Sequence, residues 1–276
     1  PYIILMTISF TKMHGLGNDF VVIDQRDSNT PLDPSLIPIL GNRRRGIGFD
    51  QLLTILPAKN DGDIFLKINN PDGSEAEACG NGTRCVADLI MNESNLSKIT
   101  IETTAGNLIC QRDSDENIIV NMGYVKTDWD DIPLLKFTDT LQVTLENAPF
   151  TNCTCVNIGN PHAVFFCNDT DAINLDEVGP ILEKHSMFPH GANIEFATVE
   201  TRRKIRMRVW ERGAGITEAC GSGACAVLVA AVRNDLTERD AEVNLDGGNL
   251  YIKWTDSGSI LMTGPAEISF QGEVII

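Results

Sequence analysis

Cys79-Gly80-Asn81-Gly82 and Cys220-Gly221-Ser222-Gly223 are the two stretches that decide the fold. The second follows the first by 141 positions in a chain of 276 residues, and Glu-Ala precedes each. Each half of the chain therefore carries one Cys-Gly-x-Gly turn, and a segment with a helical apolar pattern follows each turn. Two cysteines that stand alike in two copies of a unit indicate a pair of equivalent groups that face one centre.

The duplication extends beyond these turns to other polar positions. The offset of 141 or 142 recurs in three more pairs: Gly17-Asn18 with Gly159-Asn160, Gln51 with Asn193, and Asn70 with Glu211. The chain is therefore interpreted as two homologous halves joined within 123–133, where Gly, Asp, Trp and Pro cluster. We expect a first lobe over 1–124 and a second lobe over 125–264.

Short runs rich in Ile and Val, separated by Gly, Pro, Asn and Asp, predict many strands. These runs lie at 20–23, 51–56, 64–68, 99–101, 108–110, 118–120, 154–158, 163–167, 194–199, 204–209, 241–245, 250–254 and 260–262. Helical patterns are fewer, at 34–42, 82–93, 175–184 and 223–235. The predicted fold class is therefore α+β and rich in strands.

The composition indicates a soluble globular protein: apolar residues make up 42% and the net charge is −16. No apolar run approaches the roughly 18 residues of a membrane span, and the first residues show no signal-peptide pattern. The acidic charge disfavours nucleic acid and anionic membranes as partners. Arg43-Arg44-Arg45 is a local basic exception that we interpret as a solvated face or as ion-pair partners. We expect a cytoplasmic protein, and Met6 is a candidate for its native start.

Eight cysteines in a chain of this length, without a secretion signal, are typical of thiols in a reducing compartment. Their spacings match no paired C-x2-C zinc pattern, and the four histidines form no metal-binding motif, so no metal is expected. No dinucleotide fingerprint or phosphate-binding loop is present. Six cysteines are interpreted as packing residues: Cys85, Cys110, Cys153, Cys155, Cys167 and Cys225.

The other two, Cys79 and Cys220, stand where a cysteine can do chemistry. A helix that begins directly after a cysteine places its sulfur near unsatisfied backbone N–H groups, which should lower the thiol pKa. The same N–H groups can bind a carboxylate, and the glycines let it approach. Two such units facing each other suit racemisation or epimerisation: one thiolate removes an α-proton and the opposite thiol delivers one. Nothing in the sequence points to pyridoxal phosphate, so no cofactor is expected.

Further motifs occur in a fixed order on both sides of these turns. They are Lys12–Phe20, Gly46–Gln51 and Asn70–Cys85 in the first half, and Gly159–His162, Gly191–Asn193 and Glu211–Cys225 in the second. In these motifs the chain resembles the diaminopimelate epimerases, which interconvert LL- and meso-2,6-diaminopimelate without a cofactor. Ile216 and Phe49 depart from the family pattern, in which Glu and a small residue are usual at these positions.

The resemblance implies two pseudo-symmetric lobes, each a β-barrel-like sheet around a central helix, with the final strand at 265–276 returning to the first lobe. It implies Cys79 and Cys220 as the acid–base pair, and His162 and Glu211 as polar residues that tune them. The implied substrate-binding residues are Asn18, Gln51, Asn70, Gly80, Asn81, Asn160, Asn193, Glu211, Arg212, Gly221 and Ser222. The implied partner is diaminopimelate itself, and a homodimer is compatible with the resemblance.

Three alternatives stay open. The first is a related cofactor-independent isomerase, such as a proline racemase-like enzyme. The second is a thiol–disulfide redox protein that uses Cys79 and Cys220 as its couple, although no C-x-x-C motif is present. The third is an amino-acid-binding protein without catalysis, which would bind its ligand without exchanging the α-proton with solvent.

Overall fold

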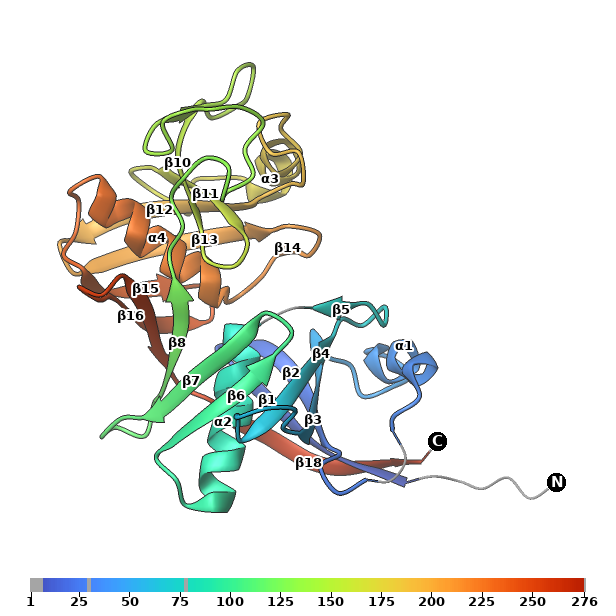
Figure 1. Ribbon diagram of the computed structural model, residues 1–276. Helices are drawn as coiled ribbons and strands as arrows, with labels where there is room; N and C mark the ends of the chain where they lie inside the picture. Colours follow the sequence, from blue (N-terminus) through green and yellow to red (C-terminus); the bar gives the residue numbers. More distant parts are fainter. Residues whose placement is uncertain (1–6, 29–30, 77–78, 276) are drawn as a thin grey trace. The chain divides into compact units, whose positions relative to one another are not determined.

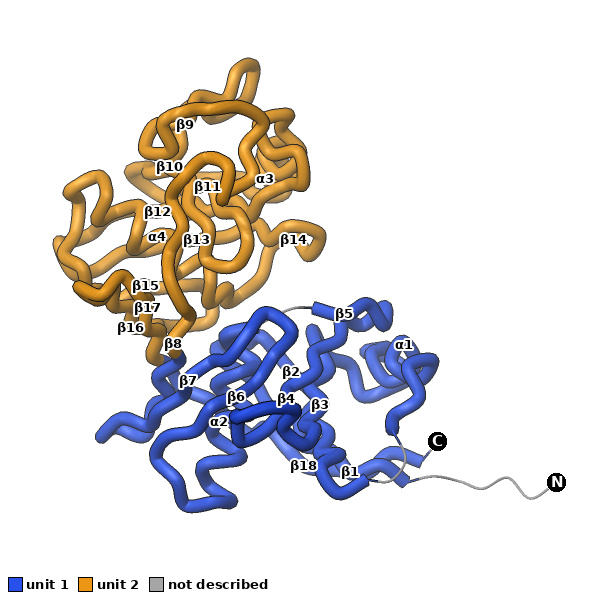
Figure 2. The backbone as a smooth tube through the Cα atoms, in the orientation of Figure 1, with its two compact units in different colours: residues 1–120, 264–276 blue, residues 121–263 orange. Residues whose placement is uncertain are grey.

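The chain forms two compact units in the computed structural model (Figure 2). The structure describes residues 7–28, 31–76 and 79–275. Unit 1 contains residues 1–120 and 264–276, and unit 2 contains residues 121–263. The predicted domain division after residue 124, with 265–276 returning to the first lobe, stays a prediction. The proposed start at Met6 lies outside the described residues.

Unit 1 is a sheet with one long helix (Figure 1). Its strands are β1 (Thr7–Gly15), β2 (Asn18–Asp24), β3 (Gln51–Pro57), β4 (Ile64–Asn69), β5 (Glu75–Ala76), β6 (Lys98–Thr103), β7 (Gly106–Arg112), β8 (Ile118–Tyr124) and β18 (Glu267–Ile275). Its helical segments are the 3-10 turn η1 (Pro34–Leu36), α1 (Ile37–Gly41) and α2 (Gly80–Ser94). The long strand β8 continues into unit 2.

The strands of unit 1 pair in the order β18, β1, β2, β3, β4, β6, β7, β8. Neighbours are antiparallel except for β2 with β3 and β4 with β6, which are parallel. The sheet packs one face against α2, which contacts β1, β2, β3, β6 and β7. Around α1, a second cluster of buried side chains covers β2 and β3 from the other side, including Val21, Ile37, Leu40, Phe49 and Leu52.

Unit 2 repeats this arrangement around its own helix (Figure 1). Its strands are β9 (Val143–Thr144), β10 (Asn152–Asn157), β11 (Pro161–Phe166), β12 (Asn193–Thr201), β13 (Lys204–Glu211), β14 (Gly215–Ile216), β15 (Asp240–Leu245), β16 (Gly248–Trp254) and β17 (Ser259–Gly264). Its helices are α3 (Leu175–Glu183) and α4 (Gly221–Arg233). Helix α4 contacts six strands, β10, β11, β12, β13, β15 and β16.

The duplication seen in the sequence is a duplication of strand register. Between the parallel strands β2 and β3, Phe20 pairs with Gln51, and between β11 and β12, His162 pairs with Asn193, 142 positions later for both partners. The parallel pairing of β4 with β6 returns in β13 with β15. Two pseudo-symmetric α+β lobes, each with a sheet around a central helix, are therefore present as predicted.

The central helices begin earlier than their apolar pattern predicted. Helix α2 begins at Gly80 rather than at residue 82, and α4 begins at Gly221 rather than at residue 223. Each cysteine is consequently the N-cap residue of its helix, with extended backbone angles. Within the described ranges, no helix has both the length and the apolar character that crossing a membrane requires.

Candidate functional site: two half-sites built on equivalent helix starts

Cys79 lies at the start of α2, and its sulfur accepts a hydrogen bond from the backbone N–H of Gly82 at 3.4 Å. The Cys79 carbonyl accepts from both the backbone N–H and the hydroxyl of Thr83, at 2.8 Å each. The side chain is half-buried. The first turn of α2, including Gly80 and Asn81, is buried, so this helix start is a fixed cradle of N–H donors beside a thiol.

A hydrogen bond joins Asn18 and Asn81 at the end of the unit 1 sheet where β2 begins. The Asn81 amide donates to Asn18 Oδ1 at 3.2 Å, and fully buried Arg84 donates to Asn81 Oδ1 at 2.9 Å. The Asn18 amide in turn donates to Asp50 at 2.9 Å. Asn18 is the first residue of β2. The contacts therefore hold this amide at the edge where the strand begins.

Gln51 and Asn70 form a second polar pair in unit 1. We call the set of Cys79, Asn81, Asn18, Gln51 and Asn70 the first half-site. Gln51 opens β3, and its amide donates to Asn70 Oδ1 at 3.2 Å. The antiparallel pairing of β3 with β4 sets Leu52 opposite Asn69, so the start of one strand lies beside the end of the other. Sheet register thus brings together two polar residues that are distant in the sequence.

Cys220 occupies the equivalent position in unit 2. Its sulfur accepts a hydrogen bond from the Gly223 N–H at 3.4 Å and lies 3.6 Å from the Ser222 hydroxyl. Burial first, and then the charges of Glu211 and Glu195, raise the pKa of the Cys220 thiol well above its usual value. The prediction that the helix start lowers the thiol pKa is therefore wrong for Cys220, since burial and two carboxyl groups outweigh the N–H donor.

Glu211 ends β13 and lies next to this thiol. Burial raises the pKa of the Glu211 carboxyl, while hydrogen bonds from Thr217 and Cys220 partly oppose that rise. The Thr217 hydroxyl donates to Glu211 Oε1. A carboxyl group with a raised pKa in contact with a thiol suits proton exchange with sulfur near neutral pH.

His162 lies in β11 with no exposed surface. Its Nδ1 atom is 2.6 Å from Oε1 of Glu195, which is equally buried, and its Nε2 atom is 2.8 Å from Oδ1 of Asn160. Burial raises the pKa of the Glu195 carboxyl, and the nearby His162 opposes that rise. Glu195 was not identified from the sequence. The available signal was an acidic residue inside an apolar strand.

Asn193 and Arg212 complete this half-site. Asn193 opens β12, and its Oδ1 accepts the backbone N–H of Arg212 at 2.8 Å. The guanidinium of Arg212 donates to the carbonyl of His190 at 3.0 Å, and the residue is exposed. The predicted residues of the second half therefore gather where β12 begins, β13 ends and α4 begins.

The two half-sites have the same backbone arrangement but differ in their charged side chains. Counting back 142 positions from His162 and Glu195 leads to Phe20 and Leu53, both apolar and buried. Glu211 corresponds in the same way to the neutral Asn70, 141 positions earlier. The half-site of Cys220 thus carries three titratable neighbours that have no counterpart in the first unit.

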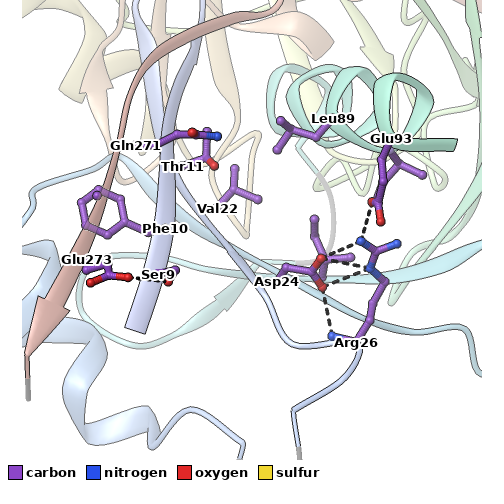
Figure 3. A pocket seen from close by; sticks show the side chains of 13 residues that line it. Ser9, Phe10, Thr11, Val22, Asp24, Arg26, Leu89, Glu93, Gln271 and Glu273 are labelled. Carbon is purple, nitrogen blue, oxygen red and sulfur yellow. Dashed lines mark hydrogen bonds and ion pairs between the residues drawn. The ribbon is translucent and has the colours of Figure 1, made fainter. Parts of the chain in front are cut away.

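A pocket of about 620 Å³ lies elsewhere in unit 1, among β1, β2, β18 and the last turns of α2 (Figure 3). None of the predicted site residues lines it. Arg26 fills its charged side by donating to Asp24 and Glu93 at 2.6 Å each. These charges pair with one another, and the remaining charged group of the lining, Glu273, accepts a hydrogen bond from the Ser9 hydroxyl at 3.5 Å.

Five of the six remaining cysteines are buried thiols, Cys85, Cys110, Cys153, Cys155 and Cys225, and Cys167 is half-buried. Burial raises the pKa of Cys85 and of Cys110 to about 12 each. In the part of the chain that the structure describes, no cluster of three or more His, Cys, Asp or Glu could hold a metal ion.

Comparison with known proteins adds a family to this geometry. The family model described as diaminopimelate epimerase matches residues 10–127 and 154–269. The diaminopimelate epimerase of Rhodospirillum centenum is 50% identical over 98% of this chain and 93% of its own length. That of Gluconobacter oxydans is 48% identical over 97% of this chain and 99% of its own.

Solved structures with this fold include more distant proteins. A PhzF-family phenazine biosynthesis protein from Bacillus anthracis superposes with a TM-score of 0.71 at 17% identity, covering 98% of this chain and 100% of its own. A hydroxyproline epimerase from Agrobacterium vitis superposes with a TM-score of 0.70 at 15% identity, covering 99% and 93%. At such low identity these matches show the fold alone.

Proposed function

The chain belongs to the diaminopimelate epimerase family, and from this membership we propose that Cys79 and Cys220 are the two acid–base groups that interconvert LL- and meso-2,6-diaminopimelate. The observation that carries the proposal is the matched position of the two sulfurs. Each caps the first turn of an equivalent helix and accepts an N–H hydrogen bond at 3.4 Å. The chain is an isomerase, and diaminopimelate is its substrate.

The proposed reaction balances with two thiols and no other reagent. One sulfur, as a thiolate, removes the proton on the α-carbon and becomes a thiol, and the electron pair is delocalised into the adjacent carboxylate. The other sulfur, as a thiol, delivers its proton to the opposite face and becomes a thiolate. The roles exchange for the reverse reaction, so the chemistry needs no cofactor.

The helix starts supply the stabilisation that this carbanion requires. An α-proton beside a carboxylate is weakly acidic, so the charge that develops on the carboxylate must be held by preorganised donors. The N–H groups of Gly80, Asn81, Gly221 and Ser222 belong to the first turns of α2 and α4, at the positive end of each helix dipole, where an anion is stabilised. We assign these four residues to the reacting carboxylate.

The amide residues suit recognition of the remaining polar groups of the substrate. Diaminopimelate has two α-amino-carboxylate ends, so one end must react while the other is bound. Amides offer donors to a carboxylate and acceptors to an ammonium group, and an exposed guanidinium can pair with a carboxylate. We assign substrate binding to Asn18, Gln51, Asn70, Asn160, Asn193, Glu211 and Arg212, and tuning of the thiols to His162 and Glu211.

Isotope exchange tests the cysteine assignment. In heavy water, the enzyme should incorporate deuterium at the α-carbon of both LL- and meso-diaminopimelate. Cys79→Ala and Cys220→Ala should each abolish full epimerisation, while Cys167→Ser, which alters a half-buried thiol outside both half-sites, should retain it. Near-normal turnover in either alanine variant would refute the two-base mechanism.

A substrate panel separates this function from that of a related isomerase. Proline and hydroxyproline carry one carboxylate each, so they would leave the amides for the distal end unpaired, and we expect no turnover of either. Binding of diaminopimelate without deuterium exchange would indicate a binding protein. Reversible oxidation coupled to a partner thiol would indicate a redox protein.

We propose that the protein is a homodimer that uses the strand β18. Three apolar side chains of this strand, Ile268, Phe270 and Ile275, are exposed by 48%, 51% and 64%, and Phe270 packs edge-on against Phe10 of β1. Exposed apolar side chains gathered on one strand are typical of an interface. Phe270→Asp should convert a dimer to a monomer in light scattering, and a wild-type monomer would refute this assembly.

We propose that the enzyme works in the cytoplasm, because a thiol and thiolate pair stays functional only under reducing conditions. The net charge of −16 further disfavours nucleic acid and anionic membranes as partners. Cell fractionation with an assay of epimerase activity would check the location.

A further inference from the structure

Glu195 is an acidic side chain in the interior of unit 2 to which the reaction above assigns no role. It lies in β12 with no exposed surface. Its Oε1 atom approaches His162 Nδ1 at 2.6 Å, and its Oε2 atom is buried without a hydrogen-bond partner among the described residues. A half-satisfied buried carboxyl group is costly, which calls for a functional explanation.

Glu195 also lies close to the thiol. A side-chain carbon added at Gly223 would lie 3.0 Å from Glu195 Oε1 and 3.2 Å from the Cys220 sulfur. Carboxyl group and sulfur therefore approach the same point on the first turn of α4. In unit 1 the equivalent of Glu195 is Leu53, so the fold itself does not require an acid at this position.

The acceptor beside Nε2 fixes the hydrogen pattern of the pair formed by Glu195 and His162. Nε2 lies 2.8 Å from Asn160 Oδ1, an oxygen that can only accept, so Nε2 carries a hydrogen. Nδ1 lies 2.6 Å from Glu195 Oε1, so either the ring donates to the carboxylate or a protonated carboxyl group donates to the ring. Burial raises the pKa of Glu195, which favours the protonated carboxyl group.

That hydrogen determines the orientation of Asn160. Because Nε2 donates, the atom of Asn160 that lies 2.8 Å away must be its oxygen, as the structure has it. The amide nitrogen of Asn160 then points away from His162 and is left to donate elsewhere. An amide in this orientation offers hydrogen atoms to an anion, whereas the flipped amide would offer a lone pair.

We propose that Glu195 is a positioning residue, which locks His162 with hydrogen on Nε2 and thereby turns the Asn160 amide into a donor for a substrate carboxylate. The inference rests on the proposed function, because it takes the ligand of Asn160 to be a carboxylate. The proposal adds Glu195 and the position of the His162 hydrogen to the second half-site. The contacts run from Glu195 in β12 to His162 in β11, and from His162 to Asn160 in the turn before β11.

Other titratable groups surround this pair and belong in the argument. Glu195 interacts electrostatically with Cys155 of β10, with Glu211 of β13 and with Cys220 of α4. All three are acids, so each of them, when ionised, disfavours a negative charge at Glu195.

Two variants test the proposal by complementary routes. Glu195→Leu introduces the residue of the equivalent position in unit 1, and Glu195→Gln preserves size for the case in which the leucine variant does not fold. We expect KM for diaminopimelate to rise about tenfold in the variants, with a smaller change in kcat, because Nε2 loses its fixed hydrogen and Asn160 can flip. Combined with Asn160→Ala, Glu195→Gln should add little further loss.

Nitrogen-15 NMR of the histidine rings gives a readout independent of activity, with His162 assigned by its absence in His162→Gln. In the wild type, the spectrum at neutral pH should show hydrogen on Nε2. In Glu195→Leu, or Glu195→Gln if only that variant folds, it should show a mixture of rings with hydrogen on Nε2 and rings with hydrogen on Nδ1. A folded variant with wild-type KM and a wild-type ring spectrum would overturn the proposal. A wild type with the expected spectrum but no epimerase activity would instead refute the proposed function.

Discussion

The Arg43 guanidinium donates hydrogen bonds to both carboxylate oxygens of Asp19, at 2.9 and 2.6 Å, in a bidentate contact. Lys12, which is almost fully buried, donates to the same carboxylate and to the carbonyl of Gly48. Asp19 follows Asn18 and is itself tied to Asp50 through the backbone N–H of each residue. This ionic cluster therefore holds the start of β2, where Asn18 contributes to the first half-site.

The cluster predicts an acid-sensitive contribution to stability. Burial alone would raise the pKa of Asp19, but hydrogen bonds from Arg43 and Lys12 outweigh it and lower this pKa to about 2. A carboxyl group whose pKa is lower in the folded state stabilises the fold above its unfolded pKa of roughly 3.9. That contribution, at most about 2 kcal/mol because Arg43 is half-exposed, is lost as the pH falls from about 4 to 2.

Urea unfolding of the wild type and of Asp19→Asn at several pH values checks this. The free energy of unfolding should be lower in the variant at pH 6, and the gap should shrink as the pH approaches 2. Asp61→Asn, at an exposed position outside the cluster, is the control. A gap between wild type and Asp19→Asn that is independent of pH would contradict the assigned pKa.

The Cys220 thiol should resist alkylation in the ligand-free enzyme. Its pKa is raised, first by burial and then by Glu211 and Glu195, so the reactive thiolate is scarce at pH 8. Glu211→Gln removes one of the opposing charges, lowers the pKa of Cys220 and should speed its reaction with iodoacetamide several-fold at that pH. Peptide mass mapping follows the rate at each cysteine.

Cys85 is the internal control for that experiment, because burial raises its pKa to about 12 and Glu211 is not among the groups that affect it. Its alkylation rate should be the same in wild type and Glu211→Gln. An equal acceleration at both cysteines would mean that the substitution loosens the fold, and no acceleration at Cys220 would mean that Glu211 does not hold the thiol protonated.

The repeat could be predicted because the duplicated positions carry the residue types that the tight turns and the proposed chemistry require. The glycines that begin α2 and α4, and the amides that begin β3 and β12, recur at a nearly constant offset. Strands such as β15, which buries every second residue, coincide with short apolar runs that predicted them. In contrast, β1 was missed, since it pairs on both sides and buries the consecutive residues Lys12 and Met13, so its sequence shows no clear alternation.

The asymmetry between the half-sites was not predictable from the pattern. Offset comparison finds what the two halves share, whereas Glu195 and His162 replace apolar residues of the first half. Their significance depends on a 2.6 Å contact between neighbouring parallel strands. The pKa of Cys220 depends on burial and on side chains from three elements, so the rule for a thiol at a helix start could not determine its direction.

Thr217 tunes Glu211, and removing its hydroxyl should shift the pH dependence of catalysis. The hydroxyl donates to Glu211 Oε1 and lowers the pKa of that carboxyl. In Thr217→Val the pKa of Glu211 should rise further, so a larger fraction is protonated at pH 7 and cannot take up the proton of the Cys220 thiol. We expect the acidic limb of the kcat/KM profile to move to higher pH, with a loss of about three- to tenfold at pH 7.

Thr217→Ser retains the hydroxyl and should behave like the wild type. A profile that is merely scaled down in Thr217→Val, without movement of its acidic limb, would show that the threonine acts through packing rather than through the carboxyl group.

Replacing Gly223 with alanine should lower activity without lowering stability. A methyl group there would lie 3.0 Å from Glu195 Oε1 and 3.2 Å from the Cys220 sulfur, so the sulfur must move. Alanine also favours the helix over glycine by up to about 1 kcal/mol. We therefore expect Gly223→Ala to lower kcat/KM at least about tenfold, because misplacing a reacting group is costly, with a melting temperature close to that of the wild type.

In Gly82→Ala, the equivalent change in α2, the methyl group would meet the side chain of Leu53 at 3.0 Å. Since that side chain can turn aside without moving Cys79, activity should fall less. Equal losses in the two variants would show that helix packing, rather than displacement of the Cys220 sulfur, sets the effect.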